Sequence, residues 1–155
     1  MTYPYGVQIG VVGVDPDTGQ ATVERFLLAY DIGRSINPTL VGGQLIGGFV
    51  QGLGGALYEE FRYDESGQPL SVTLADYLLP TAQEAPTVEV LVTEDAPSPL
   101  NPLGIKSVGE GGINGVGAVI AAAIDDAIGL PSAVMRLPAT PQRLRALVNA
   151  AAQRK

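Results

Sequence analysis

Two stretches near the N-terminus show the alternation of apolar with small or polar residues that is typical of β-strands. In residues 5–15, Val7, Ile9 and Val11 alternate with small or polar residues. Residues 21–31 are rich in β-branched and aromatic side chains. Between the two stretches Pro16 fixes φ and Gly19 tolerates a positive φ, so we predict an antiparallel hairpin.

A long helix with two different faces is predicted after this hairpin. Asn37 is a typical N-cap and Pro38 suits the first helical position, so the helix is expected to run to about Glu60. Its apolar residues recur at helical spacing and predict a core stripe of Leu45, Ile46, Phe49, Val50, Leu53 and Leu57. The other side, called the glycine face below, carries Gln44, Gly47, Gly48, Gln51 and Gly55. Each interior Gly costs roughly 1 kcal/mol relative to Ala, so we expect this face to meet a group that needs close approach and amide hydrogen bonds.

The rest of the chain predicts one more strand and two more helices. The strand is indicated by alternating Val88, Val90 and Val92, and an extended linker after it by Pro97, Pro99 and Pro102. Helices are expected from about Ile113 to Gly129 and from Pro141 onward. The expected fold class is therefore α+β, with antiparallel strands packed with helices, in a single domain over residues 1–155.

The composition is that of a globular domain with few groups for chemistry. The chain has 155 residues, a formal net charge of −7, no His and no Cys. The acidic balance argues against nucleic acid as a partner, because binding it needs clustered Lys and Arg. The missing residue types exclude imidazole bases, thiolate nucleophiles, the usual zinc sites and iron–sulfur ligation by this chain, and we assign no metal ligand.

One uncharged stretch, residues 35–58, is long enough to span a bilayer. Seven Gly, two Gln and Pro38 dilute its hydrophobicity, so we expect a buried helix of a soluble protein and no membrane contact. The N-terminal Met1-Thr2-Tyr3-Pro4 lacks the basic and apolar regions of a signal peptide. A cytoplasmic location is the resulting expectation.

Glu110 is the leading candidate for chemistry, because it stands among small residues in Lys106-Ser107-Val108-Gly109-Glu110-Gly111, just before an apolar run. The alternative is that Glu110 only caps the following helix, which stabilises a helix by up to about 1 kcal/mol. For Gln44 and Gln51 the alternative is a pair of buried amides satisfied by backbone. Nucleotide-binding loops fit poorly, since Ile105 stands where a phosphate loop needs Gly and Asn114 replaces the third Gly of a dinucleotide fingerprint.

Taken in order, several short segments resemble the C-terminal molybdenum-cofactor-binding domain of the xanthine dehydrogenase and aldehyde oxidase family of molybdenum hydroxylases. They cover nearly the whole chain: Tyr5-Gly6-Val7, Asp31-Ile32-Gly33, Ile36-Asn37-Pro38, Gly43-Gln44, Gly47 to Gly54, Asp76 to Pro80, Asn101 to Gly104, Lys106 to Glu110 and Leu137 to Pro141. The resemblance implies that residues 1–155 are the C-terminal part of a longer molybdopterin-binding catalytic subunit, either truncated or encoded separately.

The same resemblance implies roles for individual residues. Glu110 matches the family's general base, and Gln44 matches an amide that contacts the molybdopterin. Gly47 and the segment Lys106, Ser107, Val108 and Gly109 are expected to lie beside the cofactor. Ser107 departs from the Gly that many bacterial relatives carry there, which affects the expected local backbone geometry.

The implied activity is hydroxylation of an aldehyde or an N-heterocycle, with water supplying the oxygen. The implied cofactor is molybdenum-molybdopterin, which includes the cytosine dinucleotide form, while 2Fe-2S and FAD centres lie on other chains. The implied partners are the remainder of the large subunit, iron–sulfur and flavin subunits and a small-molecule substrate. The isolated chain is expected to be inactive and to form a homodimer that covers its exposed faces.

Two alternatives stay open at this point. The chain is a non-catalytic assembly module of the same fold, or it is part of a large subunit like that of carbon monoxide dehydrogenase. A weaker third hypothesis is an independent small-molecule-binding domain that uses the glycine loop.

Overall fold

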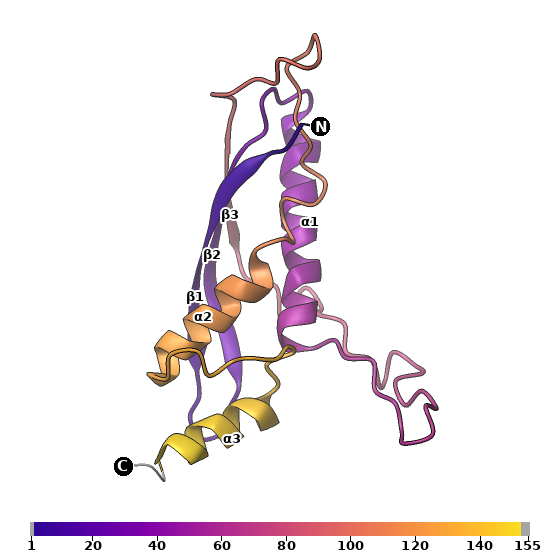
Figure 1. Cartoon of the computed structure of the whole chain (residues 1–155), viewed down its shortest axis with the longest axis vertical. Helices are drawn as coiled ribbons and strands as arrows, with labels where there is room; N and C mark the ends of the chain where they lie inside the picture. Colours follow the sequence, from indigo (N-terminus) through magenta and orange to yellow (C-terminus); the bar gives the residue numbers. More distant parts are fainter. Residues whose placement is uncertain (1, 153–155) are drawn as a thin grey trace.

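A computed structural model describes residues 2–152 and contains one mixed sheet with helices packed on one side (Figure 1). The elements are β1 (Tyr5–Val14), β2 (Ala21–Asp31), α1 (Pro38–Leu57), β3 (Val88–Thr93), α2 (Val116–Ile128) and α3 (Pro141–Ala152). The strand order is β1-β2-β3. The expected α+β class is confirmed.

The predicted hairpin is present. β1 pairs with β2 antiparallel, from Tyr5 opposite Asp31 to Val14 opposite Ala21, with one irregularity after Val11. The side chain of Asp15 accepts hydrogen bonds from the amide of Asp17 and the hydroxyl of Thr18, both at 2.8 Å, and so closes the turn.

The third strand corrects the expectation of an antiparallel sheet. β3 pairs with β2 in parallel, from Phe26 opposite Val88 to Asp31 opposite Thr93. α1 carries the chain from the end of β2 back toward its start. β3 therefore runs in the same direction as β2. A crossover of this kind necessarily gives parallel strands.

α1 forms the centre of the core. Asn37 caps the helix as predicted, because its side chain accepts a hydrogen bond from the amide of Leu40 at 3.1 Å. Phe49 is fully buried, with its ring centroid 4.5 Å from that of Phe26 on β2. The core stripe is confirmed for Leu45, Phe49, Leu53 and Leu57, but Ile46 is exposed and the helix ends at Leu57 rather than near Glu60.

By length and composition alone, α1 also qualifies as a candidate membrane span. About 44% of its apolar window is buried inside the fold. The helix packs against α2 and β3, and the expectation that it makes no membrane contact stays a prediction.

The glycines of α1 fall into two groups. A Cβ on Gly48 would lie 3.0 Å from Cα of Gly112, and a Cβ on Gly52 would lie 2.6 Å from the Cβ of Val116. A Cβ added to Gly43, Gly47 or Gly55 would meet no atom within 4 Å. Close approach is thus confirmed within the chain for Gly48, while what meets Gly47 stays a prediction.

This division predicts opposite effects of one substitution at two positions. Gly52→Ala should lower the free energy of unfolding by about 1–2 kcal/mol, because overpacking against Val116 outweighs the helix propensity gained. Gly43→Ala is the matched control and should raise the same free energy by about 0.5–1 kcal/mol, since its Cβ enters open space. Urea denaturation of the chain measures both, and equal effects would contradict the packing.

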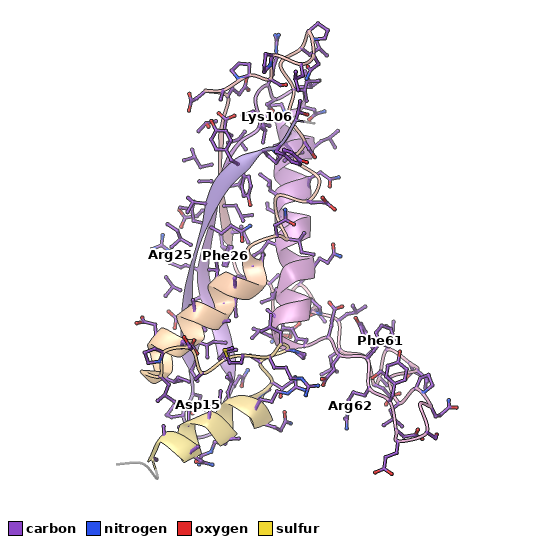
Figure 2. The ribbon with its side chains drawn as sticks, viewed as in Figure 1. Asp15, Arg25, Phe26, Phe61, Arg62 and Lys106 are labelled. Carbon is purple, nitrogen blue, oxygen red and sulfur yellow. The ribbon has the colours of Figure 1, made fainter. Side chains whose placement is uncertain are left out.

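The C-terminal elements close the lower end of the fold. α2 begins at Val116, later than predicted, and ends at Gly129, which adopts the left-handed conformation as expected. α3 attaches mainly through the buried Leu144 and through Arg143, whose guanidinium lies 2.6 Å from the carboxylate of Glu60. Between α1 and β3, an arm that includes Phe61 and Arg62 projects away from the body (Figure 2).

Candidate functional site

The loop of residues 106–112 runs beside the upper half of α1 (Figure 1). Gly112 leaves no room for a side chain, and Gly111 leaves little. A Cβ on Gly112 would overlap with the carbonyl of Leu45, and a Cβ on Gly111 would lie 3.2 Å from the side chain of Leu45. The backbone of the loop therefore rests directly on α1, next to Gln44 and Gly47.

Gln8 on β1 holds the same part of the loop from the other side. Its Nε2 donates to the carbonyl of Gly111 and to the hydroxyl of Tyr30, both at 3.0 Å. Its Oε1 is buried without a hydrogen-bond partner and would lie 2.9 Å from a Cβ on Gly115. Sequence reasoning missed Gln8, although a lone amide among small and apolar residues of a strand was an available signal.

Lys106 anchors the beginning of the loop through a buried ion pair. Its Nζ lies 2.8 Å from Oδ1 of Asp31, with side-chain exposures of 9% and 4%, and 4.2 Å from the ring centroid of Tyr5. The Lys106 amide donates to the carbonyl of Ile32 at 2.9 Å. The Lys106 side chain is thus already paired within the chain. A contact of Lys106 with the cofactor would have to come from its carbonyl, and it stays a prediction.

Asp31 gathers three segments around one carboxylate. Besides Lys106, it accepts hydrogen bonds from the amides of Gly33 at 3.0 Å, Asp95 at 2.7 Å and Ala96 at 3.0 Å. Burial raises the pKa of Asp31, but the hydrogen bonds from Lys106 and these amides outweigh it and hold that pKa well below its usual range. The carboxylate is therefore ionised and acts as a structural anchor for the loop.

The segment before Lys106 is folded back on itself, which corrects the predicted extended linker. Asn101 donates from Nδ2 to the carbonyl of Ile105 at 2.8 Å and accepts from the amide of Ile105 at 2.9 Å. Gly104 has φ +69°, which suits Gly. A side-chain clamp thus closes a turn where the three prolines indicated an extended chain.

Glu110 lies at the exposed outer side of the loop. It borders a hollow of about 530 Å³ that is also lined by Tyr3, Tyr5, Tyr30, Ser107 and Asn114. The N-cap of α2 is Gly115, with no side-chain cap hydrogen bond, so the alternative that Glu110 caps the helix is wrong. Its carboxylate contributes no hydrogen bond or ion pair to the described fold.

The backbone around Glu110 presents unused donors. Within residues 2–152, the amides of Ser107, Val108, Gly109 and Glu110 donate no hydrogen bond. Gly109 is exposed, and a Cβ on it would meet no atom within 4 Å. The loop therefore offers successive free N–H groups beside an open surface and a carboxylate, as a bound polar group would require.

Gln44 and Gly47 lie exposed on α1, one residue before Leu45 and Gly48, which contact the loop. Gln51 is exposed as well, so the alternative of two buried amides is wrong. The structure thus brings the glycine face and the loop of residues 106–112 into one neighbourhood, although their sequence separation exceeds 50 residues.

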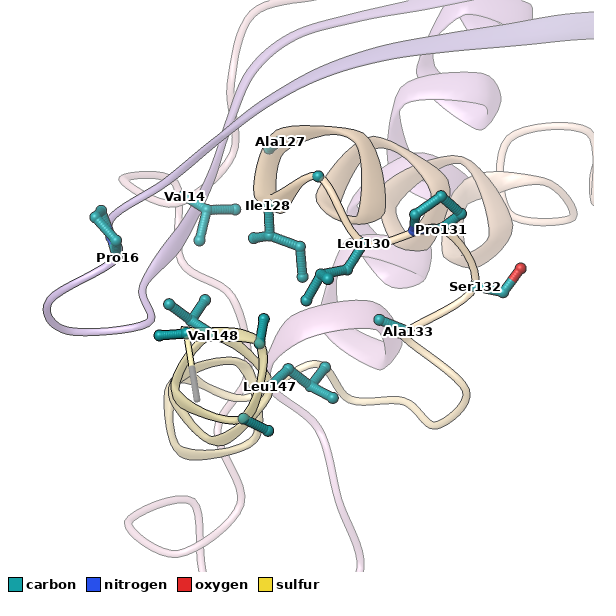
Figure 3. A pocket seen from close by; sticks show the side chains of 14 residues that line it. Val14, Pro16, Ala127, Ile128, Leu130, Pro131, Ser132, Ala133, Leu147 and Val148 are labelled. Carbon is teal, nitrogen blue, oxygen red and sulfur yellow. The ribbon is translucent and has the colours of Figure 1, made fainter. Parts of the chain in front are cut away.

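A larger hollow lies elsewhere, and we do not assign it to this site. It measures about 940 Å³ and is lined mainly by alkyl side chains of the hairpin, of α3 and of the segment around Gly129 (Figure 3). Only Ser132 adds a polar side chain, so it lacks groups for chemistry. Among the described residues there is also no cluster of three or more Asp or Glu that suits a metal ion.

Comparison with known proteins identifies similar chains. Residues 1–86 match the family model described as molybdopterin cofactor-binding domain. The chain is 54% identical over 144 residues to the 6-hydroxypseudooxynicotine dehydrogenase complex subunit gamma of Paenarthrobacter nicotinovorans, covering 93% of this chain and 18% of that protein.

Two solved structures have the same fold. Reconstituted CO dehydrogenase from Oligotropha carboxidovorans superimposes with a TM-score of 0.90 at 34% identity, over 98% of this chain and 19% of that one. Quinoline 2-oxidoreductase from Pseudomonas putida 86 superimposes with a TM-score of 0.86 at 38% identity, over 93% of this chain and 18% of that one. The present chain thus corresponds to less than a fifth of each of these proteins.

Proposed function

Because the chain belongs to the molybdopterin cofactor-binding domain family of molybdenum hydroxylase large subunits, we propose that it supplies the general base and part of the cofactor cradle of such an enzyme. The observation that carries this proposal is the open loop, in which Glu110 stands beside four amides that donate no hydrogen bond within residues 2–152. The activity would belong to the assembled protein, since the chain spans 18% of its 54% identical relative.

The residues present fit a molybdopterin. Its oxygen and nitrogen atoms need hydrogen-bond partners, and the free amides of Ser107 to Glu110 and the exposed amide of Gln44 are of the right kind. The empty space over Gly47 and Gly109 leaves room for a flat group to approach the backbone. When bound, the molybdenum cofactor would supply the two-electron redox chemistry, with electrons passing to iron–sulfur and flavin centres on other chains.

In this proposal Glu110 accepts the proton that is released when water becomes the source of the new C–O bond. A carboxylate is effective as a base when it is positioned by the protein and shielded from bulk water. The loop provides the positioning through Gln8 and Asp31, which hold its two ends. The shielding must come from a partner, since Glu110 is exposed on this chain.

For the substrate we propose an aromatic N-heterocycle, rather than the aldehydes that the resemblance equally implied. Support comes from the names of two relatives, a 6-hydroxypseudooxynicotine dehydrogenase subunit at 54% identity and a quinoline 2-oxidoreductase at 38%. The second candidate is carbon monoxide, which the similarity to CO dehydrogenase at a TM-score of 0.90 favours.

The test is to purify the native assembly that contains this chain, measure its molybdenum content and assay it with hydroxypyridines, aldehydes and carbon monoxide. We expect about one molybdenum per large subunit and oxidation of the heterocycles, with oxygen taken from labelled water. An assembly free of molybdenum would instead identify the chain as a non-catalytic module. Oxidation of carbon monoxide without oxidation of the heterocycles would show that carbon monoxide is the substrate.

A further inference from the structure

The side of the sheet that faces away from α1 and α2, called the outer face, is apolar. Alternate residues of each strand point to it, as the burial of their neighbours Phe26 and Leu28 on the inner face shows. The pairing register aligns Val7 with Ala29 and Leu91 in one row. The complete set is Tyr5, Val7, Ile9, Val11, Leu27, Ala29 and Leu91.

Five of these seven side chains are exposed, whereas Leu27 and Ala29 are partly buried. Val7, Ile9 and Leu91 retain 55%, 54% and 54% of their accessible surface. Contiguous apolar patches on soluble proteins generally mark an interaction site. In contrast, a charged pair borders one end of this apolar set: Arg25 lies 2.6 Å from Glu89, and both side chains are more than half exposed. An apolar centre with a polar rim is the usual anatomy of a protein interface.

The edge of the sheet that β1 forms is also open. β1 is an edge strand of ten residues, and within residues 2–152 it pairs only with β2. Long apolar edge strands are aggregation hazards that native proteins cover. Both the outer face and this edge therefore call for a partner.

We propose that the outer face is the docking surface for the remainder of the large subunit, which contributes an apolar sheet or helix surface. This inference rests on the proposed function. The same fold occupies only 18% of the quinoline 2-oxidoreductase chain and 19% of the CO dehydrogenase chain, so most of the polypeptide that accompanies it lies outside the fold. Tyr5 belongs both to the outer face and to the hollow beside Glu110, so a partner seated on this face extends to the carboxylate and shields it from water.

The test is Ile9→Lys, which places a charge at the centre of the outer face where the isolated chain tolerates it, since Ile9 is already 54% exposed. The chain is co-expressed with the remainder of the large subunit as a separate polypeptide and with the other subunits. We expect Ile9→Lys to weaken binding of the chain to the remainder at least tenfold. Gln20→Lys is the matched control, because it adds the same charge at an exposed position of the hairpin turn and should bind normally.

Three outcomes overturn the docking proposal: unchanged binding of Ile9→Lys, equal weakening by Gln20→Lys, or a homodimer of the chain that Ile9→Lys converts to monomer while binding to the remainder is unaffected. Unfolding curves of both isolated variants verify that they fold like the wild type. Molybdenum analysis of the wild-type complex keeps the two proposals apart. A metal-free complex that still depends on Ile9 refutes the proposed function and leaves the docking surface intact.

Discussion

Glu110→Gln should lower turnover of the assembled, molybdenum-loaded enzyme by about 100- to 10,000-fold, the usual contribution of a positioned general base. The substitution keeps the shape of the side chain and removes only its ability to accept the proton. Because the Glu110 carboxylate makes no hydrogen bond or ion pair within residues 2–152, stability and molybdenum content should stay at wild-type values. The measurement is the steady-state rate with the best heterocyclic substrate, normalised to bound molybdenum.

The matched control is Glu65→Gln, which removes the same charge from an exposed turn far along the sequence from the loop and should leave the rate unchanged. Glu110→Asp adds a graded test, since it keeps the carboxylate but withdraws it by one methylene and should give an intermediate rate. A Glu110→Gln enzyme with full molybdenum and undiminished turnover would show that the base lies elsewhere.

The second large effect is expected at the ion pair below the loop. Lys106→Met should lower the free energy of unfolding by about 3–5 kcal/mol, because it leaves the buried carboxylate of Asp31 without its counter-ion. Arg25→Met is the matched control and breaks an ion pair of similar length whose side chains are 73% and 55% exposed, so its effect should be much smaller. Comparable losses in the two variants would contradict a special role for burial.

The same pair predicts a pH dependence with a definite sign. The pKa of Asp31 is lower in the folded chain than its ordinary value of about 3.9, so the carboxylate contributes stability above that pH and loses it as the pH falls further. In Lys106→Met the folded-state pKa of Asp31 rises towards or above its ordinary value, so less stability should be lost on acidification than in the wild type. Unfolding curves of both proteins recorded between pH 7 and pH 2 measure this difference.

Much of the fold was predictable because it depends on local patterns. The hairpin follows from alternation and from one turn, and α1 follows from Asn37, Pro38 and the stripe that ends at Leu57. The direction of β3 was not predictable, because six alternating residues fit either orientation and only the path of the chain between decides it. Likewise, three prolines did not reveal that Asn101 folds the linker into a turn.

For the candidate site, the sequence indicated which residues are involved but not the long-range contacts that hold the loop in place. Glu110 was indicated by the small residues around it and the glycine face by helical spacing, and the structure brings the loop onto this face where Gly112 meets Gly48. The partner of Lys106 was missed, although the chain contains only one other Lys and a lone cation among small residues needs an acid. Such long-range pairs leave no periodic trace in a sequence.

The clamp from Gln8 to Gly111 also has a consequence for how the protein is made. These residues are 103 positions apart, and the ion pair of Lys106 with Asp31 spans 75. During synthesis, β1 and β2 leave the ribosome well before the loop that they hold, and closing such long segments is entropically slow. We therefore expect the loop of residues 106–112 to be ordered late in folding, and a chain stalled before Gly111 to contain a formed hairpin without the loop that it holds.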